Sequence, residues 1–299
     1  MLRPALLELI KRRPVLCDGG MGTQLIAAGL APGESAALWN IDRPGVIENV
    51  HRRYRAAGCD LVTTNTFQAC RQTLAMHGAA DRVREVNLAA AANARRGGGD
   101  DAIVLGDVGP FGGFLEPVGD TTSRELLAIF VEQLEALHEG GADAAIIETM
   151  SDPNELAIAV KAATQVANWP VIATFAFQKG SDGTLRTMMG TTVEHAVNAA
   201  LEAGADVVGT NCGTDMDLDD YLRLASQLVA VAVDRVPVIV QPNAGAPSTV
   251  GGQSVYPAMP DDMAELAARL VEIGVGVVGG CCGTTPDHLA AMAKALGEV

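Results

Sequence analysis

The sequence is poor in aromatic side chains and in positive charge, and it contains no long apolar run. Aromatic residues make up 4% of the 299 residues, so alanine, valine, leucine and isoleucine must fill most of the core. Lys and Arg number 21 against 36 Asp and Glu, giving a net charge of −15. This balance argues against a nucleic-acid partner, because phosphate binding requires clustered basic side chains. No apolar stretch approaches the ~20 residues that a membrane span needs, so we expect no membrane association.

Cysteine usage and the N-terminus bear on the cellular compartment. Six cysteines in a chain of this length do not form a disulfide scaffold. Residues 1–13 contain a charged cluster with no apolar segment after it, which predicts a short amphipathic helix and not a signal peptide. We therefore expect a cytoplasmic protein with reduced thiols.

One pattern recurs along the whole chain: a short apolar run closes in small or polar residues, and a longer helical segment follows. The apolar runs cover residues 15–17, 60–64, 103–106, 144–147, 171–175, 206–209, 236–240 and 275–279. Between them, residues 81–96 form an Ala-rich segment that opens with Asp81 as a helix cap, and residues 123–140 repeat leucines at helical spacing. This alternation predicts a single (β/α)₈ TIM barrel over residues 1–299, with an open doubly wound sheet as the alternative.

Polar and Gly-rich clusters follow nearly every apolar run. They include DGGMGT at 18–23, TNTF at 64–67, DVGPFGG at 107–113, ETM at 148–150, TNC at 210–212, QPNAG at 241–245 and GCCGTTP at 280–286. The carboxyl ends of the strands form one rim of such a barrel, and that rim carries the chemistry. We therefore expect these clusters to converge on one site.

Three cysteines lie in these clusters: Cys212 after the sixth run, and the adjacent Cys281 and Cys282 after the eighth. Soft thiolates favour zinc over hard cations, and three protein ligands with one open position are typical of a catalytic zinc site. Two other interpretations are a set of buried small hydrophobic residues and a redox-active pair. The first suits the other three cysteines better, because they lie in or beside apolar segments.

Histidine contributes nothing evident to this rim. His51, His77, His138 and His195 fall in helical segments, and His288 opens the last helix, so we expect all five at the surface. Without a histidine on the rim, a His-rich hydrolytic zinc site and a Cys-His protease arrangement are both disfavoured.

Two carboxylates are well placed at strand ends, Asp18 and Glu148. Their functional interpretation is recognition of an ammonium group by charge-assisted hydrogen bonds, and the alternative is helix capping or a buried salt bridge. The segment from Gly19 through Gly20 to Thr23 offers backbone N–H groups able to hold a carboxylate. Together these features predict a pocket for a zwitterionic amino acid beside a thiophilic metal.

The chain resembles the homocysteine S-methyltransferase family over essentially its whole length, from DGGMGT at 18–23 to GGCCGTTP at 279–286. The pair GTNC at 209–212 and GGCCG at 279–283 is highly specific for that family. The resemblance implies one zinc per chain on the three cysteines, with homocysteine sulfur as the fourth ligand. It also implies substrate-binding roles for the strand-end residues Asp18, Gly19, Gly20, Thr23, Glu148, Asn211 and Asn243.

The methyl donor is less well determined by the resemblance. GDVGPFG at 106–112, ETMSD at 148–152 and VYP at 255–257 are similar to the homocysteine-binding module of cobalamin-dependent methionine synthases. They imply a methyl group that arrives as methylcobalamin on a partner protein, and betaine or S-methylmethionine is the rival donor. Residues 111–122 and 246–260 border the expected mouth and are long enough to cover a small donor. A different acceptor thiol and a non-catalytic zinc-binding barrel are further alternatives.

Overall fold

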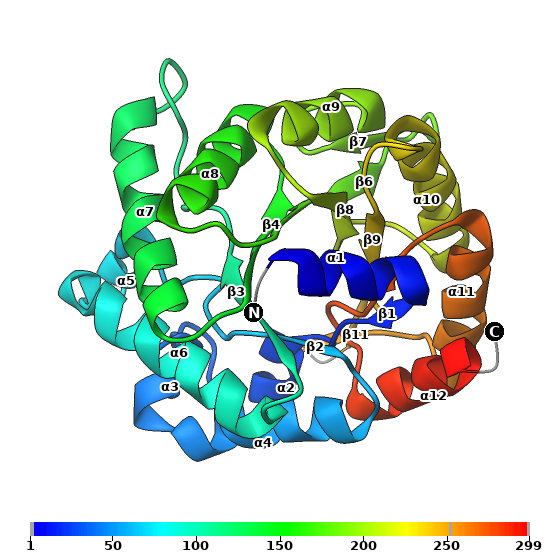
Figure 1. Ribbon diagram of the computed structural model, residues 1–299, viewed down its shortest axis with the longest axis horizontal. Coiled ribbons are helices and arrows are strands. Elements are labelled where there is room, and N and C mark those ends of the chain that lie inside the picture. The colour runs from blue at the N-terminus through cyan, green and yellow to red at the C-terminus, as the bar shows by residue number, and fades with distance from the viewer. Residues whose placement is uncertain (1–2, 251–252, 298–299) are drawn as a thin grey trace.

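The computed structural model describes residues 3–250 and 253–297, and eight parallel strands form a barrel within these ranges (Figure 1). The strands are β1 (Val15–Leu16), β2 (Leu61–Thr63), β3 (Ile103–Val108), β4 (Ala144–Met150), β5 (Val171–Phe175), β8 (Val207–Asn211), β9 (Val238–Gln241) and β12 (Val277–Val278). Their order is β1-β12-β9-β8-β5-β4-β3-β2, so the first strand pairs with the last. The Asp60 N–H donates to the Leu16 carbonyl at 2.7 Å and joins β1 to the start of β2. The predicted TIM barrel is confirmed.

Helices fill the intervals between strands and surround the barrel (Figure 1). They are α1 (Arg3–Arg12), α2 (Met21–Ala27), α3 (Trp39–Asp42), α4 (Pro44–Ala56), α5 (Arg71–Ala75), η1 (Ala80–Arg82), α6 (Val83–Gly98), α7 (Ser123–Glu139), α8 (Pro153–Val166), α9 (Val193–Ala203), α10 (Leu218–Ala232), α11 (Pro260–Ile273) and α12 (Pro286–Gly297). The predicted cap at Asp81 is wrong, because Asp81 lies inside η1 and Arg82 precedes α6. None of the described helices is long and apolar enough to cross a bilayer.

The barrel interior follows from the two-residue alternation of the strands. Inward-facing apolar residues such as Leu61, Leu105, Ile146 and Ile239 form one buried cluster. The amphipathic helix α1 lies across one opening of the barrel and adds Leu6 to that cluster (Figure 1). The opposite opening, at the carboxyl ends of the strands, is left for the site.

Three Gly-x-Asp segments turn the chain from a helix into the next strand. Their glycines have left-handed backbone angles that favour glycine, with φ of 99° at Gly58, 95° at Gly141 and 102° at Gly204. Each aspartate then accepts a hydrogen bond from a strand N–H, namely Asp60 from Leu16, Asp143 from Val104 and Asp206 from Val171. The repeated motif therefore fastens neighbouring strands at the amino end of the barrel.

Two short hairpins at the rim were not predicted. One pairs β6 (Phe177–Lys179) with β7 (Leu185–Thr187), and the other pairs β10 (Ser248–Val250) with β11 (Gln253–Val255). The second lies within residues 246–260, the stretch expected to border the mouth. Both hairpins follow barrel strands at their carboxyl ends, so they add to the rim that surrounds the site.

The histidines only partly follow the surface prediction. His77, His138 and His195 are exposed, whereas His51 and His288 are buried, so the expectation for these two was wrong. The His288 ring lies between Thr285 and the Ala258 carbonyl and joins two rim loops. The His51 side chain is fully buried in α4, and neither ring nitrogen has a partner among the described residues.

Burial of His51 makes stability depend on pH. Burial lowers the pKa of His51 from 6.5 to about 4, so between these values the unfolded chain takes up a proton that the folded protein does not. Stability is therefore lost as pH falls from 6.5 toward 4, by about 2 kcal/mol at pH 5. The unfolding free energy is measured in urea at pH 7.5 and at pH 5. We expect it to fall less between these pH values in His51→Leu than in the parent protein, because the contribution of His51 is gone. The exposed His77→Gln variant is the control, and equal pH dependence in His51→Leu and the parent protein would contradict the prediction.

Candidate functional site

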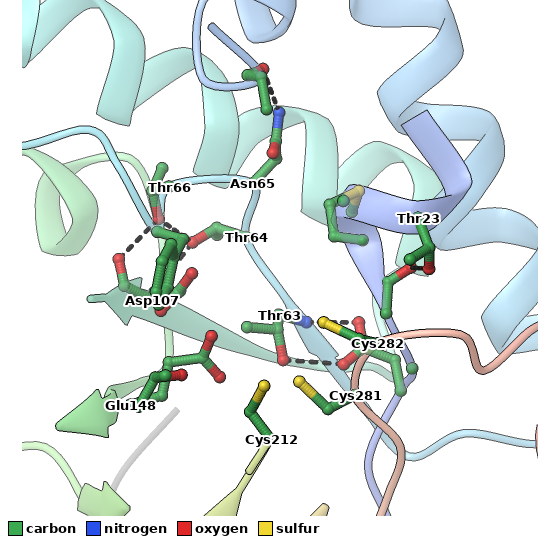
Figure 2. A pocket seen from close by; sticks show the side chains of 18 of the residues that line it. Thr23, Thr63, Thr64, Asn65, Thr66, Asp107, Glu148, Cys212, Cys281 and Cys282 are labelled. Atoms are coloured by element: carbon green, nitrogen blue, oxygen red, sulfur yellow. Dashed lines mark hydrogen bonds between the residues drawn. The ribbon is translucent and has the colours of Figure 1, made fainter. Parts of the chain in front are cut away.

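A cavity of about 410 Å³, here called the mouth cavity, opens at the carboxyl ends of the strands (Figure 2). Its lining comes from β1, β2, β3, β4, β8, β9 and β12 or the loops that follow them, seven of the eight barrel strands in the described ranges. The polar clusters noted in the sequence therefore converge on one rim, as expected. The volume is within the range of small-molecule sites.

Three cysteines form one corner of this cavity. The sulfur atoms of Cys212, Cys281 and Cys282 all lie within 4.8 Å of one another, and Figure 2 shows them pointing into a shared space. Cys212 directly follows β8 and has a φ of 54°, a left-handed conformation that is uncommon outside glycine and asparagine. Strain of this kind persists where the surroundings fix it, and it is frequent at functional sites. The other three cysteines are buried away from this trio.

The thiols affect one another strongly. Hydrogen bonds from Cys281 and Cys282 lower the pKa of Cys212, whereas the closeness of Cys212 raises the pKa of Cys281. One thiolate is thus stabilised by two neighbouring thiols, and further ionisation brings like charges together. Three sulfurs at this spacing become fully ionised only beside a cation, so the donor set suits a thiophilic metal ion.

Two asparagines hold the cysteine loops in place. The Asn243 side chain accepts from the Cys282 N–H and donates to the Gly213 carbonyl, both at 3.0 Å. The Asn211 side chain accepts from the Thr149 N–H at 2.7 Å and donates to the Cys281 sulfur at 4.0 Å. Neither asparagine lines the mouth cavity. Their predicted substrate-binding roles stay predictions, and the contacts that the structure shows are with the loops that carry the cysteines.

Glycines let the loops after β1 and β12 approach closely. A Cβ on Gly20 would lie 2.5 Å from the Cys281 carbonyl oxygen, and one on Gly19 would lie 2.6 Å from the Thr284 hydroxyl. The Gly20 N–H donates to the same hydroxyl at 3.0 Å. The DGGMGT segment is therefore packed directly against the loop after β12, which contains Cys281 and Cys282.

The two predicted carboxylates both line the mouth cavity. Asp18 is buried, and it accepts hydrogen bonds from the N–H and hydroxyl of Thr63 at 2.7 and 2.8 Å. Burial nevertheless raises the pKa of Asp18 to about 7. Loss of solvent and the neighbouring Cys212 and Asp18 raise the pKa of Glu148 to about 8. Figure 2 shows the Glu148 carboxylate beside the Cys212 sulfur. Among the described residues that line the cavity, none is a basic side chain that could neutralise either acid.

A third carboxylate, Asp107, was not predicted as a site residue. The apolar run was expected to end at residue 106, but β3 continues to Val108 through pairing with β4. Asp107 therefore continues the inward alternation of Ile103 and Leu105 and is only 3% exposed. Extending the two-residue alternation of this strand by one step would have placed Asp107 on the inward face.

Close packing at Gly20 gives a test of the site architecture. Gly20 has an ordinary φ of −62°, so the backbone conformation accepts alanine, and the added Cβ would meet the Cys281 carbonyl and the Thr23 hydroxyl, the latter at 2.8 Å. We expect Gly20→Ala to lower the unfolding free energy by about 1–3 kcal/mol through overpacking. Gly22→Ala is the matched control, because nothing lies within 4 Å of a Cβ there. Equal melting temperatures for the two variants would refute the close-packing role of Gly20.

Comparison with known proteins is consistent with this geometry. The sequence profile of homocysteine S-methyltransferases matches residues 15–296. Methionine synthase of Mycobacterium leprae is 36% identical over 97% of this chain, and methionine synthase of Mycobacterium tuberculosis is 36% identical over 98%. The chain spans about a quarter of the length of these two relatives, 25% in each case.

Solved structures share the fold at lower identity. The metallated form of the homocysteine methyltransferase MmuM from Escherichia coli superposes with a TM-score of 0.78 at 23% identity, covering 97% of this chain and 98% of that one. A methyltransferase from Methanosarcina mazei gives a TM-score of 0.60 at 13% identity, covering 98% and 97%. These likenesses show the fold alone, and the sequence match shows the family. The chain belongs to the homocysteine S-methyltransferase family.

Proposed function

We propose that this protein transfers a methyl group to the thiol of homocysteine, giving methionine, with a zinc ion held by Cys212, Cys281 and Cys282. The observation that carries the proposal is the trio of sulfur atoms within 4.8 Å of one another in a cavity lined by carboxylates. A thiophilic metal and an ammonium-binding surface in one cavity suit an amino acid that carries a thiol. The family membership supports the same reaction class.

Zinc is the metal that this donor set fits best. Three thiolates with no histidine among the lining residues favour a soft, four-coordinate ion and leave one position for the substrate. Bound zinc would lower the pKa of a substrate thiol, which is about 8.5 in free cysteine, and so favour the thiolate at neutral pH. The chain's own contribution is to position the sulfur ligands, through Asn211 and Asn243.

The lining of the mouth cavity offers groups for both ends of a zwitterionic substrate. Asp18 and Glu148 supply negative charge for the ammonium group. Backbone N–H groups of the loop that contains Gly19, Gly20 and Thr23, which also lines the cavity, are able to hold the substrate carboxylate.

A methylcorrinoid protein is the donor that we favour. Apolar side chains stand exposed on the rim, with Phe114 at 55%, Met188 at 68% and Met189 at 46%. These three line a second cavity of about 250 Å³ between the loops that follow β3 and β4 and the segment after β7. Exposed apolar surface of this kind typically marks a protein interaction site, and a donor carried on a protein would cover it. Betaine or S-methylmethionine remains the rival donor.

Metal analysis tests the ligand assignment. We expect one zinc per chain by plasma emission, and loss of most of it in Cys212→Ser and in Cys281→Ser, because a serine oxygen is a much poorer ligand for zinc than a thiolate. Cys70→Ala is the control, since Cys70 is buried beside Thr73 and outside the mouth cavity. Full zinc retention in both serine variants would refute the assignment.

A donor panel tests the reaction. Methionine formation from homocysteine is compared with methylcobalamin, betaine and S-methylmethionine under identical conditions. We expect turnover with methylcobalamin. With a methylcorrinoid protein as donor, we expect lower turnover when Met188 and Met189 are both replaced by serine, because the docking surface loses apolar area. Turnover with only a small sulfonium or ammonium donor would overturn the corrinoid assignment. Methylation of another thiol but not of homocysteine would overturn the acceptor.

A further inference from the structure

The mouth cavity contains polar atoms whose hydrogen bonding is incomplete. Within the described residues, six buried side-chain oxygen or nitrogen atoms have no partner, and two of them belong to residues that line this cavity. These two are Oδ1 of Asp107 and Oε1 of Gln241, and both are acceptors. Buried acceptors without donors are costly, so a ligand that brings N–H groups is the natural complement.

The charge of the cavity also favours a ligand that brings N–H groups. Asp18, Asp107 and Glu148 all line it, and none of its described lining residues is lysine, arginine or histidine. Burial and the charges of Glu148 and Asp18 raise the pKa of Asp107 well above its ordinary value. A cation bound between these groups would relieve both the repulsion and the desolvation.

The three carboxylates are not equivalent as acceptors. Asp18 already receives two hydrogen bonds from Thr63, which fix its carboxylate against β2. Asp107 receives none at Oδ1, although its backbone N–H and carbonyl are bonded to Thr64 and Thr66. The backbone is thus fixed while one buried carboxylate oxygen lacks a hydrogen-bond donor among the described residues. Figure 2 shows Asp107 and Glu148 on the same wall, with Glu148 between Asp107 and Cys212.

We propose that Asp107 is a specificity-determining residue that accepts a hydrogen bond from the substrate ammonium group, together with Glu148. This inference rests on the proposed function and extends it to the substrate class: an aminothiol is preferred over a thiol that lacks the amino group. Asp18 contributes charge and positions Thr63, and Asp107 supplies the open acceptor.

Paired ligands separate this role from a structural one. Calorimetry on the zinc-loaded protein compares homocysteine with 4-mercaptobutanoate, which has the same chain, thiol and carboxylate but no amino group. The amino-group preference is the ratio of the two dissociation constants. We expect Asp107→Asn to reduce this preference by roughly ten- to a hundredfold, the usual effect of losing a charge-assisted hydrogen bond, while 4-mercaptobutanoate still binds. Retained binding of 4-mercaptobutanoate also shows that the variant is folded.

Glu155→Gln is the matched control. Glu155 is also buried with a pKa raised to about 7, but it accepts from the Phe111 N–H and lines the second cavity instead of the mouth cavity. Its variant is expected to keep the amino-group preference. An unchanged preference in Asp107→Asn, or an equal loss for both ligands, overturns the role of Asp107 while the proposed function stands. Absence of homocysteine binding to the parent protein refutes the proposed function, and this inference with it.

Discussion

Two sets of negative or potentially negative groups share one cavity, and the described residues that line it include no lysine, arginine or histidine to balance either set. Cys212, Cys281 and Cys282 bring three sulfurs together, and the acids Asp18, Asp107 and Glu148 line the same cavity. In a low-dielectric cavity such groups either keep their protons or bind cations. The function that we propose therefore takes its balancing charges from ligands, a metal ion on the sulfur side and an ammonium group on the acid side.

Holding these groups together requires a rigid rim. Each cysteine loop is fastened by contacts from other strands: Asn243 from β9 bonds to both loops, and Asn211 at the end of β8 bonds to β4 and to Cys281. Gly20 allows the first loop to lie against Cys281. The left-handed φ of Cys212 persists because this network fixes it. Rigidity matters because a sulfur trio that relaxed outward would lose its affinity for the metal.

The barrel and the cysteine trio could be predicted from the sequence because both leave local signals. Buried parallel strands appear as continuous apolar runs, and the three cysteines stand beside glycines shortly after two of these runs. The missed features depend on contacts between distant segments. Asp107 interrupts an apolar run, so hydrophobicity ended the strand at residue 106, two residues too early, whereas pairing with β4 extends it to Val108. The contacts of Asn211 and Asn243 with the cysteine loops join segments that are distant in the sequence. The burial of His51 depends on what packs against α4, which the sequence of α4 alone does not indicate.

Under the proposed function, the division of the cavity into a sulfur side and an acid side would let one site select homocysteine among cellular thiols. A thiophilic metal would provide affinity for any thiol, and it would not discriminate by itself. Discrimination comes from buried acceptors that stay unpaired when the wrong ligand binds, a penalty that rejects analogues more strongly than a missing apolar contact does. Asp107 meets this condition because its backbone is fixed, its side chain is buried and one oxygen lacks a donor. Under this proposal, selectivity for the amino group arises because the substrate ammonium donates to the Asp107 carboxylate, whereas a thiol without an amino group leaves Oδ1 of Asp107 unpaired.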